Sequence, residues 1–327
     1  MRLARIKAGQ LEGAVYHCIS RTVGGQKLLD DACKERMASL LISLAGFCGL
    51  EVITYCMMGN HFHVLVRVPK AVPLSDEELL RRAEGFYGKQ GVLVVLARDA
   101  MKSEGQGGGK MPLHIRQTLL GRMGDVSVLM KEFKQRFSRW YNRRTERFGT
   151  LWAERFKSVL VEDSPEALRT VAAYIDLNPV RAGLVSDPKD YRFCGYAAAL
   201  VGRRELQRGL MSVFFQANWA RVSALYREAM FLQAGVSGHS SKNALDRESI
   251  LAVLQEGGQL SEAEILRLRV RHLTDGVALG SKEFVDSVFF RYRSLFGPRR
   301  KDGARPIRGA PWSRLSTLRD LRVNAFG

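Results

Sequence analysis

The sequence predicts an α+β protein, in which a small antiparallel sheet with packed helices is followed by a mostly helical C-terminal domain. Three observations lead to this prediction. Segments with a period of two and one helical segment follow each other before residue 70, in the order strand, helix, strand, strand. Residues 125–144 then repeat apolar side chains every three or four positions, as an amphipathic helix does. After about residue 200 the helical pattern dominates.

The strand, helix, strand and strand of the first observation lie within residues 14–68. The helix has apolar residues at spacings of three and four, and the last two strands are joined by Gly59 and Asn60, which are typical of a turn. These two strands therefore form a predicted hairpin. The predicted elements are a strand at 14–21, a helix at 32–48 and strands at 50–58 and 61–68.

Two histidines of the last strand, His61 and His63, share one face of the sheet because side chains alternate along a strand. Phe62, between them, points to the other face. Two neutral imidazoles on neighbouring positions of a rigid strand can bind a metal ion. The same pattern also occurs among surface histidines and hydrogen-bonded core histidines, so it leaves both interpretations open.

Residues 71–124 depart from the pattern of the sheet. A short helix is predicted at 76–84, an apolar run follows at 92–97, and a glycine-rich stretch follows at 103–109. We interpret 71–124 as an insertion between two parts of the sheet domain.

The helix predicted at 125–144 has one basic face. It has acidic residues only at Asp125 and Glu132. Such a face is either solvated or contacts phosphates, and the excess of cations favours phosphate contact. Trp152 and Arg155, just beyond, could stack on DNA and pair with phosphate, although Trp152 could equally be a core residue. The candidate DNA-binding residues are Lys131, Lys134, Arg136, Arg139, Arg143, Trp152 and Arg155.

A further helix is predicted from Ser164 to about Leu177, after a strand at 157–162. Ser164 and the following proline are a favourable helix start, and Pro179 is expected to end the helix. Tyr174 and Asn178 are four residues apart and share a face near its C-terminal end.

We predict two domains, residues 1–200 and residues 201–327. In the second, 205–233 and 245–296 have mostly helical patterns joined by a Gly/Ser-rich stretch, and Ser281 is a predicted helix start. The tail is rich in arginine, so we expect this domain to add DNA binding.

Charge and composition agree with a nucleic-acid partner. The 327 residues are 46% hydrophobic, and 51 Lys and Arg against 33 Asp and Glu give a formal charge of +18. Such a charge favours a polyanion. A basic surface can also bind anionic membranes, but no apolar run reaches the roughly 18 residues that span a bilayer. The first residues lack an apolar signal-peptide core, so we expect a cytoplasmic protein.

The His pair, Tyr174 and Asn178 together indicate phosphoryl-transfer chemistry. A metal held by two imidazoles and an amide keeps its full positive charge for a phosphodiester and can act as a Lewis acid. Tyrosine is a weak nucleophile at its free pKa and needs such activation. A covalent tyrosine intermediate conserves the energy of the cut bond, so the strand can be rejoined elsewhere.

Five motifs in this order resemble those of the HUH single-tyrosine transposases, and most closely the REP-associated tyrosine transposases. The resemblance covers roughly residues 10–200, apart from the insertion. The motifs are M-G-N-H-F-H-V-L-V at 58–66, F-K-Q-R-F-S-R-W-Y-N-R-R at 133–144, G-T-L-W-A-E-R-F-K-S at 149–158, Y-I-D-L-N-P-V-R-A-G-L-V at 174–185 and D-Y-R-F-C-G-Y at 190–196.

The resemblance implies a ferredoxin-like or RRM-like sheet and a single-stranded DNA substrate, often next to a hairpin. It also implies Mg or Mn and a 5′-phosphotyrosine intermediate that leaves a free 3′-hydroxyl. Carried over to this sequence, His61 and His63 match the metal-binding pair, Tyr174 matches the nucleophile, and Asn178 falls at the position of a third polar ligand. A homodimer is possible in such a family, but the sequence does not show one.

Several alternatives stay open. Tyr141 also lies on a basic helix and could be the nucleophile, although Tyr174 is preferred. Asn178 could cap its helix instead of binding metal. His17 is interpreted as a strand residue with a hydrogen-bond partner. The alternative functions are a domesticated DNA-hairpin-binding or regulatory protein that does not cut, and a phosphodiesterase that uses water as the nucleophile.

Overall fold

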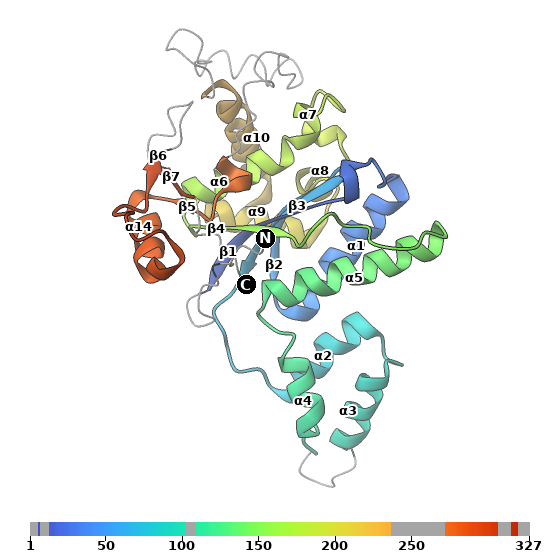
Figure 1. Cartoon of the computed structure of the whole chain (residues 1–327). Coiled ribbons are helices and arrows are strands. Elements are labelled where there is room, and N and C mark those ends of the chain that lie inside the picture. The colour runs from blue at the N-terminus through green and yellow to red at the C-terminus, as the bar shows by residue number, and fades with distance from the viewer. Residues whose placement is uncertain (1–5, 7–12, 103–108, 237–271, 307–314, 320–327) are drawn as a thin grey trace.

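The computed structural model of the chain describes residues 6, 13–102, 109–236, 272–306 and 315–319. In this part of the chain, helices pack around one seven-stranded sheet with the order β2-β3-β1-β4-β5-β7-β6 (Figure 1). The strands are β1 (Ala14–Arg21), β2 (Glu51–Met57), β3 (His61–Val68), β4 (Lys157–Val161), β5 (Ala278–Gly280), β6 (Arg305–Pro306) and β7 (Ser316–Leu318).

The first four strands have the topology of a ferredoxin-like sheet. β1 leads through α1 (Asp31–Cys48) to β2, and β3 then lies between β1 and β2, antiparallel to both. β4 pairs antiparallel with the other edge of β1. This is the split arrangement in which a strand is inserted between the two strands of a βαβ unit. The predicted α+β class and the predicted hairpin are therefore confirmed.

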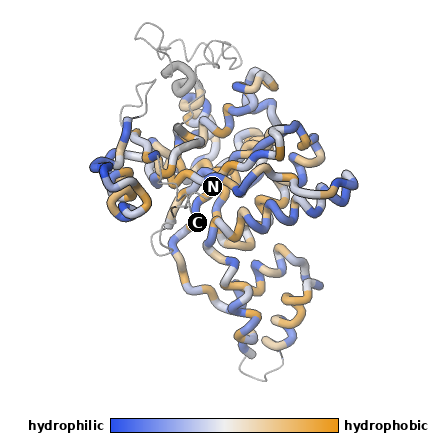
Figure 2. The backbone as a smooth tube through the Cα atoms, in the orientation of Figure 1, coloured by the Kyte–Doolittle hydropathy of each residue, from blue (hydrophilic) through white to orange (hydrophobic). Residues whose placement is uncertain are grey.

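The two faces of the sheet are covered by different helices. Phe62 points to the face covered by α1 and α5 (Val126–Arg144), where its ring lies 5.3 Å from that of Phe133. The opposite face carries α6 (Pro165–Asp176), which packs against α9 (Arg204–Phe214) and α10 (Trp219–Val236). Hydrophobic segments are concentrated in the strands and in the helices that pack on them (Figure 2). No helix among the described residues is long and apolar enough to cross a membrane.

Side chains cap the starts of α1 and α14 (Lys282–Arg291), whereas Ser164, at the predicted start of α6, makes no side-chain capping hydrogen bond. Asp30 accepts a hydrogen bond of 2.8 Å from the backbone N–H of Cys33 at the start of α1. Ser281 accepts one of 3.1 Å from the N–H of Phe284 at the start of α14. These bonds satisfy N–H groups that have no partner within the helix. Gly49 ends α1 in the left-handed region, at φ 69°, which glycine adopts without steric cost.

Residues 71–124 form a helical lobe that projects from one end of the sheet (Figure 1). Its helices are α2 (Asp76–Tyr87), α3 (Val92–Lys102) and α4 (Leu113–Leu120). The ring of Phe86 stacks on Phe47 of α1 at 5.1 Å, and the Arg136 guanidinium of α5 lies 4.9 Å from the Phe86 ring. The glycine-rich residues 103–108 lie outside the described residues.

The C-terminal part of the chain contains strands that the sequence did not predict. β5 pairs parallel with β4, β7 pairs antiparallel with β5, and β6 pairs with β7. The predicted division at residue 200 therefore does not separate two sheets or cores, because the later strands extend the first sheet. Strands of two or three residues are too short to show a period of two. The helices predicted between 245 and 271 lie outside the described residues.

α6 ends at Asp176 with Leu177 as its C-cap, so the predicted helix end at about Leu177 is confirmed. A second short helix, α7 (Asn178–Arg181), follows directly and has Pro179 in its first turn. Proline is tolerated there since the first N–H groups of a helix have no intrahelical partner. The helix that starts after Ser281 ends at Arg291 and is followed by a 3-10 turn at 293–295.

Gly209 provides a test of the packing of α9 on the sheet. A Cβ atom at this position would lie 2.5 Å from the carbonyl oxygen of Val52, whereas one at Gly46, in α1, would meet nothing within 4 Å. Gly209→Ala is therefore expected to lower the free energy of unfolding by about 1–3 kcal/mol because the site is overpacked. Gly46→Ala is the matched control and is expected to raise it by roughly 0.5–1 kcal/mol. Urea denaturation measures both, and equal effects would contradict the close packing.

Candidate active site

The two histidines of β3 lie on one face of the sheet, as their spacing predicts. In the antiparallel pairing of β1 with β3, Arg21 lies opposite His61 and Ile19 lies opposite His63. Directly opposite residues point to the same face, so Arg21 shares the face of the His pair. His17 lies two positions before Ile19 and therefore also shares it.

His17 fixes which nitrogen of His63 carries the proton. His17 is fully buried, and its Nδ1 lies 2.8 Å from the carbonyl oxygen of Leu273, which can only accept. The Nε2 of a neutral His17 is then an acceptor, and it lies 2.9 Å from the Nδ1 of His63. His63 must therefore donate from Nδ1, which leaves its Nε2 with a free lone pair.

Asn60 fixes which nitrogen of His61 carries the proton. The amide nitrogen of Asn60 donates to the carbonyl oxygen of Gly25 at 2.8 Å, so the amide oxygen faces His61. His61 Nδ1 lies 2.6 Å from this oxygen and donates to it. The Nε2 of His61 is then also an acceptor, so both histidines of the pair present the lone pair that a metal ligand needs.

The three histidine rings are uncharged at neutral pH. Burial, together with the nearby Arg21 and Arg181, lowers the pKa of His61 from 6.5 to about 4. Burial lowers the pKa of His17 to about 4 as well, although its hydrogen bond to Leu273 opposes the shift. The pKa of His63 is lowered well below its usual value by burial and by the neighbouring His17 and His61. Neutral imidazole is the form that binds metal.

Tyr174 of α6 lies next to the His rings on the same face of the sheet. Its ring centroid lies 6.0 Å from that of His63 and 6.1 Å from that of His17, in edge-on arrangements. The Arg181 guanidinium carbon lies 4.1 Å from the centre of the Tyr174 ring, and Arg181 Nη2 donates to the Tyr174 carbonyl at 2.7 Å. One chain therefore brings together the aromatic hydroxyl residue, the His pair and a cation.

Asn178 acts as a helix cap in this structure. Its amide nitrogen donates to the carbonyl oxygens of Tyr174 at 3.2 Å and of Ile175 at 3.1 Å. These carbonyls belong to the last turn of α6, where carbonyl groups run out of intrahelical N–H donors. The amide nitrogen is thereby committed to the helix end, and the amide oxygen is the only atom of the side chain that could serve as a ligand.

Asp176 anchors the helix that carries Tyr174. The carboxylate is fully buried and accepts hydrogen bonds from Thr54 of β2 at 2.9 Å and from the Tyr226 hydroxyl of α10 at 2.6 Å. It also accepts one from the backbone N–H of Tyr196 at 3.1 Å. Burial raises the pKa of Asp176 to about 6, and these hydrogen bonds oppose the shift. One carboxylate therefore joins α6 to β2, α8 (Gly195–Leu200) and α10.

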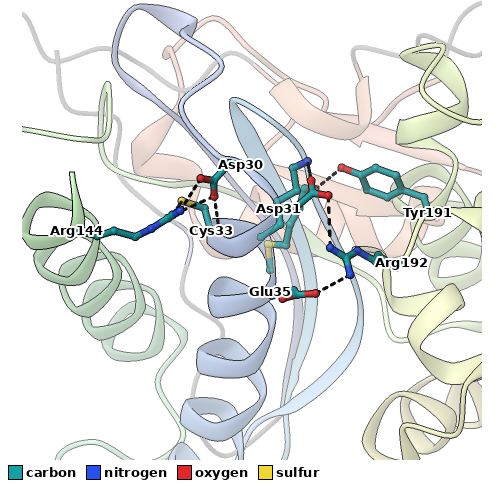
Figure 3. Close-up of polar contacts among 9 residues, drawn as sticks. Asp30, Asp31, Cys33, Glu35, Arg144, Tyr191 and Arg192 are labelled. Carbon is teal, nitrogen blue, oxygen red and sulfur yellow. Dashed lines mark hydrogen bonds and ion pairs between the residues drawn. The ribbon is translucent and has the colours of Figure 1, made fainter.

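Ion pairs around the start of α1 join this helix to the end of α5 and to the segment at 191–192 (Figure 3). Arg144, at the end of α5, pairs with Asp30 at 2.9 Å, and Arg192 pairs with Glu35 at 2.9 Å. The hydroxyl of Tyr191 donates to the carbonyl oxygen of Met57 at the end of β2 at 2.7 Å. The end of β2 is therefore held by the segment at 191–192, which pairs with α1. The end of α5 pairs with the same helix.

The structure gathers five of the seven predicted DNA-binding residues in one groove, which is lined by Lys131, Lys134, Arg139, Trp152 and Arg155 among others. Arg136 lies elsewhere: it pairs with Glu132 at 2.9 Å and covers Phe86 of the helical lobe. Arg143 is exposed but does not line the groove. That any of these residues contacts DNA stays a prediction.

Four residues of the site were not assigned to it from the sequence: His17, Arg21, Asn60 and Arg181. A signal existed for two of them, because the period of two in 14–21 places His17 and Arg21 on one face. Tyr141, the alternative nucleophile, is 6% exposed and packs beside Phe137 on the α5 side of the sheet. That is the face opposite the histidines, so the geometry favours Tyr174.

The fold and site define an α+β protein with a His pair on its sheet and a tyrosine on a neighbouring helix. Residues 10–77 match the family of IS200-like transposases, which confirms the resemblance over this segment and supports a transposase-type role. A solved structure of a REP-associated tyrosine transposase bound to a REP hairpin is also similar, with 12% identity and a TM-score of 0.39 over 61% of this chain and 87% of that one. No curated protein matches the chain.

The protonation states can be tested by nitrogen-15 NMR of the histidine rings. His17, His61 and His63 are expected to stay neutral as the pH falls from about 8 to about 5, with His61 and His63 protonated at Nδ1. The folded pKa of His17 and His61 is below the unfolded value, so their protonation favours unfolding. The free energy of unfolding should therefore fall as the pH drops from 6.5 toward 4. Rings that titrate at the ordinary value would contradict this arrangement.

Proposed function

We propose that this protein is a transposase that cuts and rejoins single-stranded DNA through Tyr174, at sites next to hairpins. The observation that best supports this proposal is the position of the Tyr174 ring, 6.0 Å from the ring of His63, whose Nε2 lone pair is free. Both residues belong to one chain, so no second copy is needed to bring them together.

The reaction uses the Tyr174 hydroxyl as the nucleophile. Its oxygen attacks the scissile phosphorus and forms a bond to the 5′-phosphate, while the bond from phosphorus to the 3′-oxygen breaks. The tyrosine loses its proton and the 3′-oxygen gains one, so a 5′-phosphotyrosine and a free 3′-hydroxyl result. Attack by a 3′-hydroxyl on the phosphotyrosine reverses these changes and rejoins a strand.

A divalent metal, Mg or Mn, is the cofactor that the family resemblance implies, and two neutral imidazoles can contribute to its binding. His61 and His63 would hold it through Nε2, and the amide oxygen of Asn178 is a candidate third ligand. No group of three or more His, Cys, Asp or Glu side chains in the described residues is placed to hold a metal ion, so substrate phosphate and water would supply the other ligands. When bound, the metal supplies Lewis-acid polarisation of the phosphate.

Cations of the protein itself surround this position. Arg181 is held on the Tyr174 ring, and Arg21 lies across from His61. Lys157 of β4 lies opposite Ile19 and so shares the same face. These side chains would bind the non-bridging oxygens of the phosphate and orient it toward the tyrosine. Hydrogen bonds from Arg181 and Asn178 to the end of α6 keep the tyrosine in place during this step.

A denaturing gel tests the tyrosine mechanism directly. Labelled single-stranded hairpin DNA from the flanks of the gene, incubated with Mg or Mn, is expected to give a slowly migrating covalent band with the wild-type protein. Tyr174→Phe should abolish the band because the attacking oxygen is removed, and His61→Ala should abolish it because one metal ligand is lost. Tyr141→Phe is the matched control and should keep it.

Other outcomes of the same gel identify other functions. If the DNA is cleaved without a covalent band, and Tyr174→Phe still cleaves it, water is the nucleophile. A band that survives Tyr174→Phe but not Tyr141→Phe contradicts the assignment of the tyrosine. Binding without cleavage or adduct, over several flanking sequences, favours a regulatory hairpin-binding protein.

His17 is expected to be a positioning residue for the metal ligand His63. His17→Ala should weaken Mn binding by about 10–100-fold, the usual effect of losing a hydrogen bond that orients a metal ligand. His17→Gln should restore part of the affinity, because its amide oxygen can accept from His63 Nδ1. Mn binding is measured by electron paramagnetic resonance, with circular dichroism to verify the fold. Wild-type affinity in a folded His17→Ala protein would contradict this role.

A further inference from the structure

A groove between α5 and the segment before β4 is separate from the His and Tyr174 site. Its volume is about 660 Å³. One wall is a single stripe of α5, from Ser127 to Arg139, which at 1.5 Å per residue is about 18 Å long. The other wall is the segment from Gly149 to Phe156. A groove of this length extends beyond a single nucleotide.

The rim of the groove is positively charged and available to a ligand. Lys131, Arg139 and Arg155 are exposed, and none of them forms an ion pair with another described residue. The one carboxylate of the groove, Glu154, pairs with Lys157 at 3.5 Å. Within the described part of the chain no acidic side chain pairs with these three cations, which favours a ligand with several phosphates.

The floor of the groove is apolar and includes an aromatic ring. It is formed by Met130, Leu151, Trp152 and Phe156, which are all less than a tenth exposed. The Trp152 Nε1 donates to the carbonyl oxygen of Lys134 at 3.3 Å, and the Lys134 amine lies 5.3 Å from the Trp152 ring. A duplex turns its phosphates outward and keeps its bases stacked inside, so it gains little from such a floor. Unpaired bases expose their faces and can rest on it.

Main-chain hydrogen bonds join this groove to the active site. The N–H of Val23 donates to the Leu151 carbonyl at 3.0 Å, and the N–H of Ala153 donates to the Arg21 carbonyl at 3.0 Å. Arg21 lies opposite His61 in the sheet. The Trp152 ring also packs edge-on against Phe62, between the two histidines in sequence, at 5.5 Å. The groove therefore lies on the α5 side of the sheet, beside the end of β1 that carries Arg21.

We infer that this groove binds a single-stranded segment of the DNA next to the cleavage site, with phosphates on Lys131, Arg139 and Arg155 and bases on the apolar floor. The inference rests on the proposed function for its choice of DNA as the ligand. It adds the place where the unpaired strand lies and the reason why single strands are preferred to duplex.

Charge reversal of a groove residue tests this inference. Binding is measured on the full chain with Tyr174→Phe, without metal, using fluorescent oligo-dT and a blunt duplex of equal length. Arg139→Glu is expected to weaken oligo-dT binding about tenfold and to reduce its salt dependence by about one ion. Arg208→Glu is the matched control, because Arg208 is exposed on α9 and also forms no ion pair with a described residue. It makes the same change in net charge and should have little effect.

The outcomes separate this inference from the proposed function. The inference would be overturned if Arg139→Glu and Arg208→Glu weakened oligo-dT binding equally. It would also be overturned if Arg139→Glu weakened duplex binding as much as oligo-dT binding. If the wild-type protein then still forms the covalent band, only the groove assignment fails. Selective loss of oligo-dT binding in Arg139→Glu, with no covalent band in the wild type, would support the groove and refute the cleavage function.

Discussion

The geometry of the site depends on one buried carboxylate. Asp176 binds Thr54, Tyr196 and Tyr226 from three different elements, and together they fix the rotation of α6 about its axis. Tyr174 is two residues away, which is roughly 200° around a helix, so anchoring Asp176 also decides the direction of Tyr174. A buried charge without these donors would be costly, since each of its oxygens would lose its hydration. The same network that makes the carboxylate tolerable therefore positions the tyrosine.

A second set of polar contacts prepares the histidines. Leu273, His17 and His63 form a chain of hydrogen bonds that starts at a backbone carbonyl, and Gly25, Asn60 and His61 form another. Each chain starts at an atom that can only accept, so the direction of every donor after it is determined. The Nε2 lone pairs of both histidines are thus set before any ligand arrives. Preorganisation of this kind reduces the reorganisation needed when substrate binds.

The sequence was sufficient where a single segment carries the information. The alternation after His61 and the capping residue Ser281 predict β3 and the start of α14 because both effects are local. Contacts between distant segments were not predictable: nothing near His17 indicates that Leu273 will face it. The Y-I-D-L-N-P motif located Tyr174, but not the role of Asp176, because burial depends on what packs above the helix. β5 and β7 were missed because pairing with other strands, β5 with β4 and β7 with β5, defines them and not their own pattern.

The contact between His17 and Leu273 spans 256 positions in the sequence. The strands β1 to β4 are synthesised before residue 273, so the His pair is present in the growing chain before the acceptor for His17 exists. Until then the imidazole of His17 can present either tautomer to His63. A chain interrupted by a premature stop codon before residue 273 would keep the His pair and Tyr174 but lack the carbonyl that orients His17 and, through it, His63. The hydrogen bond that orients His17 can therefore form only after the chain has been synthesised past residue 273.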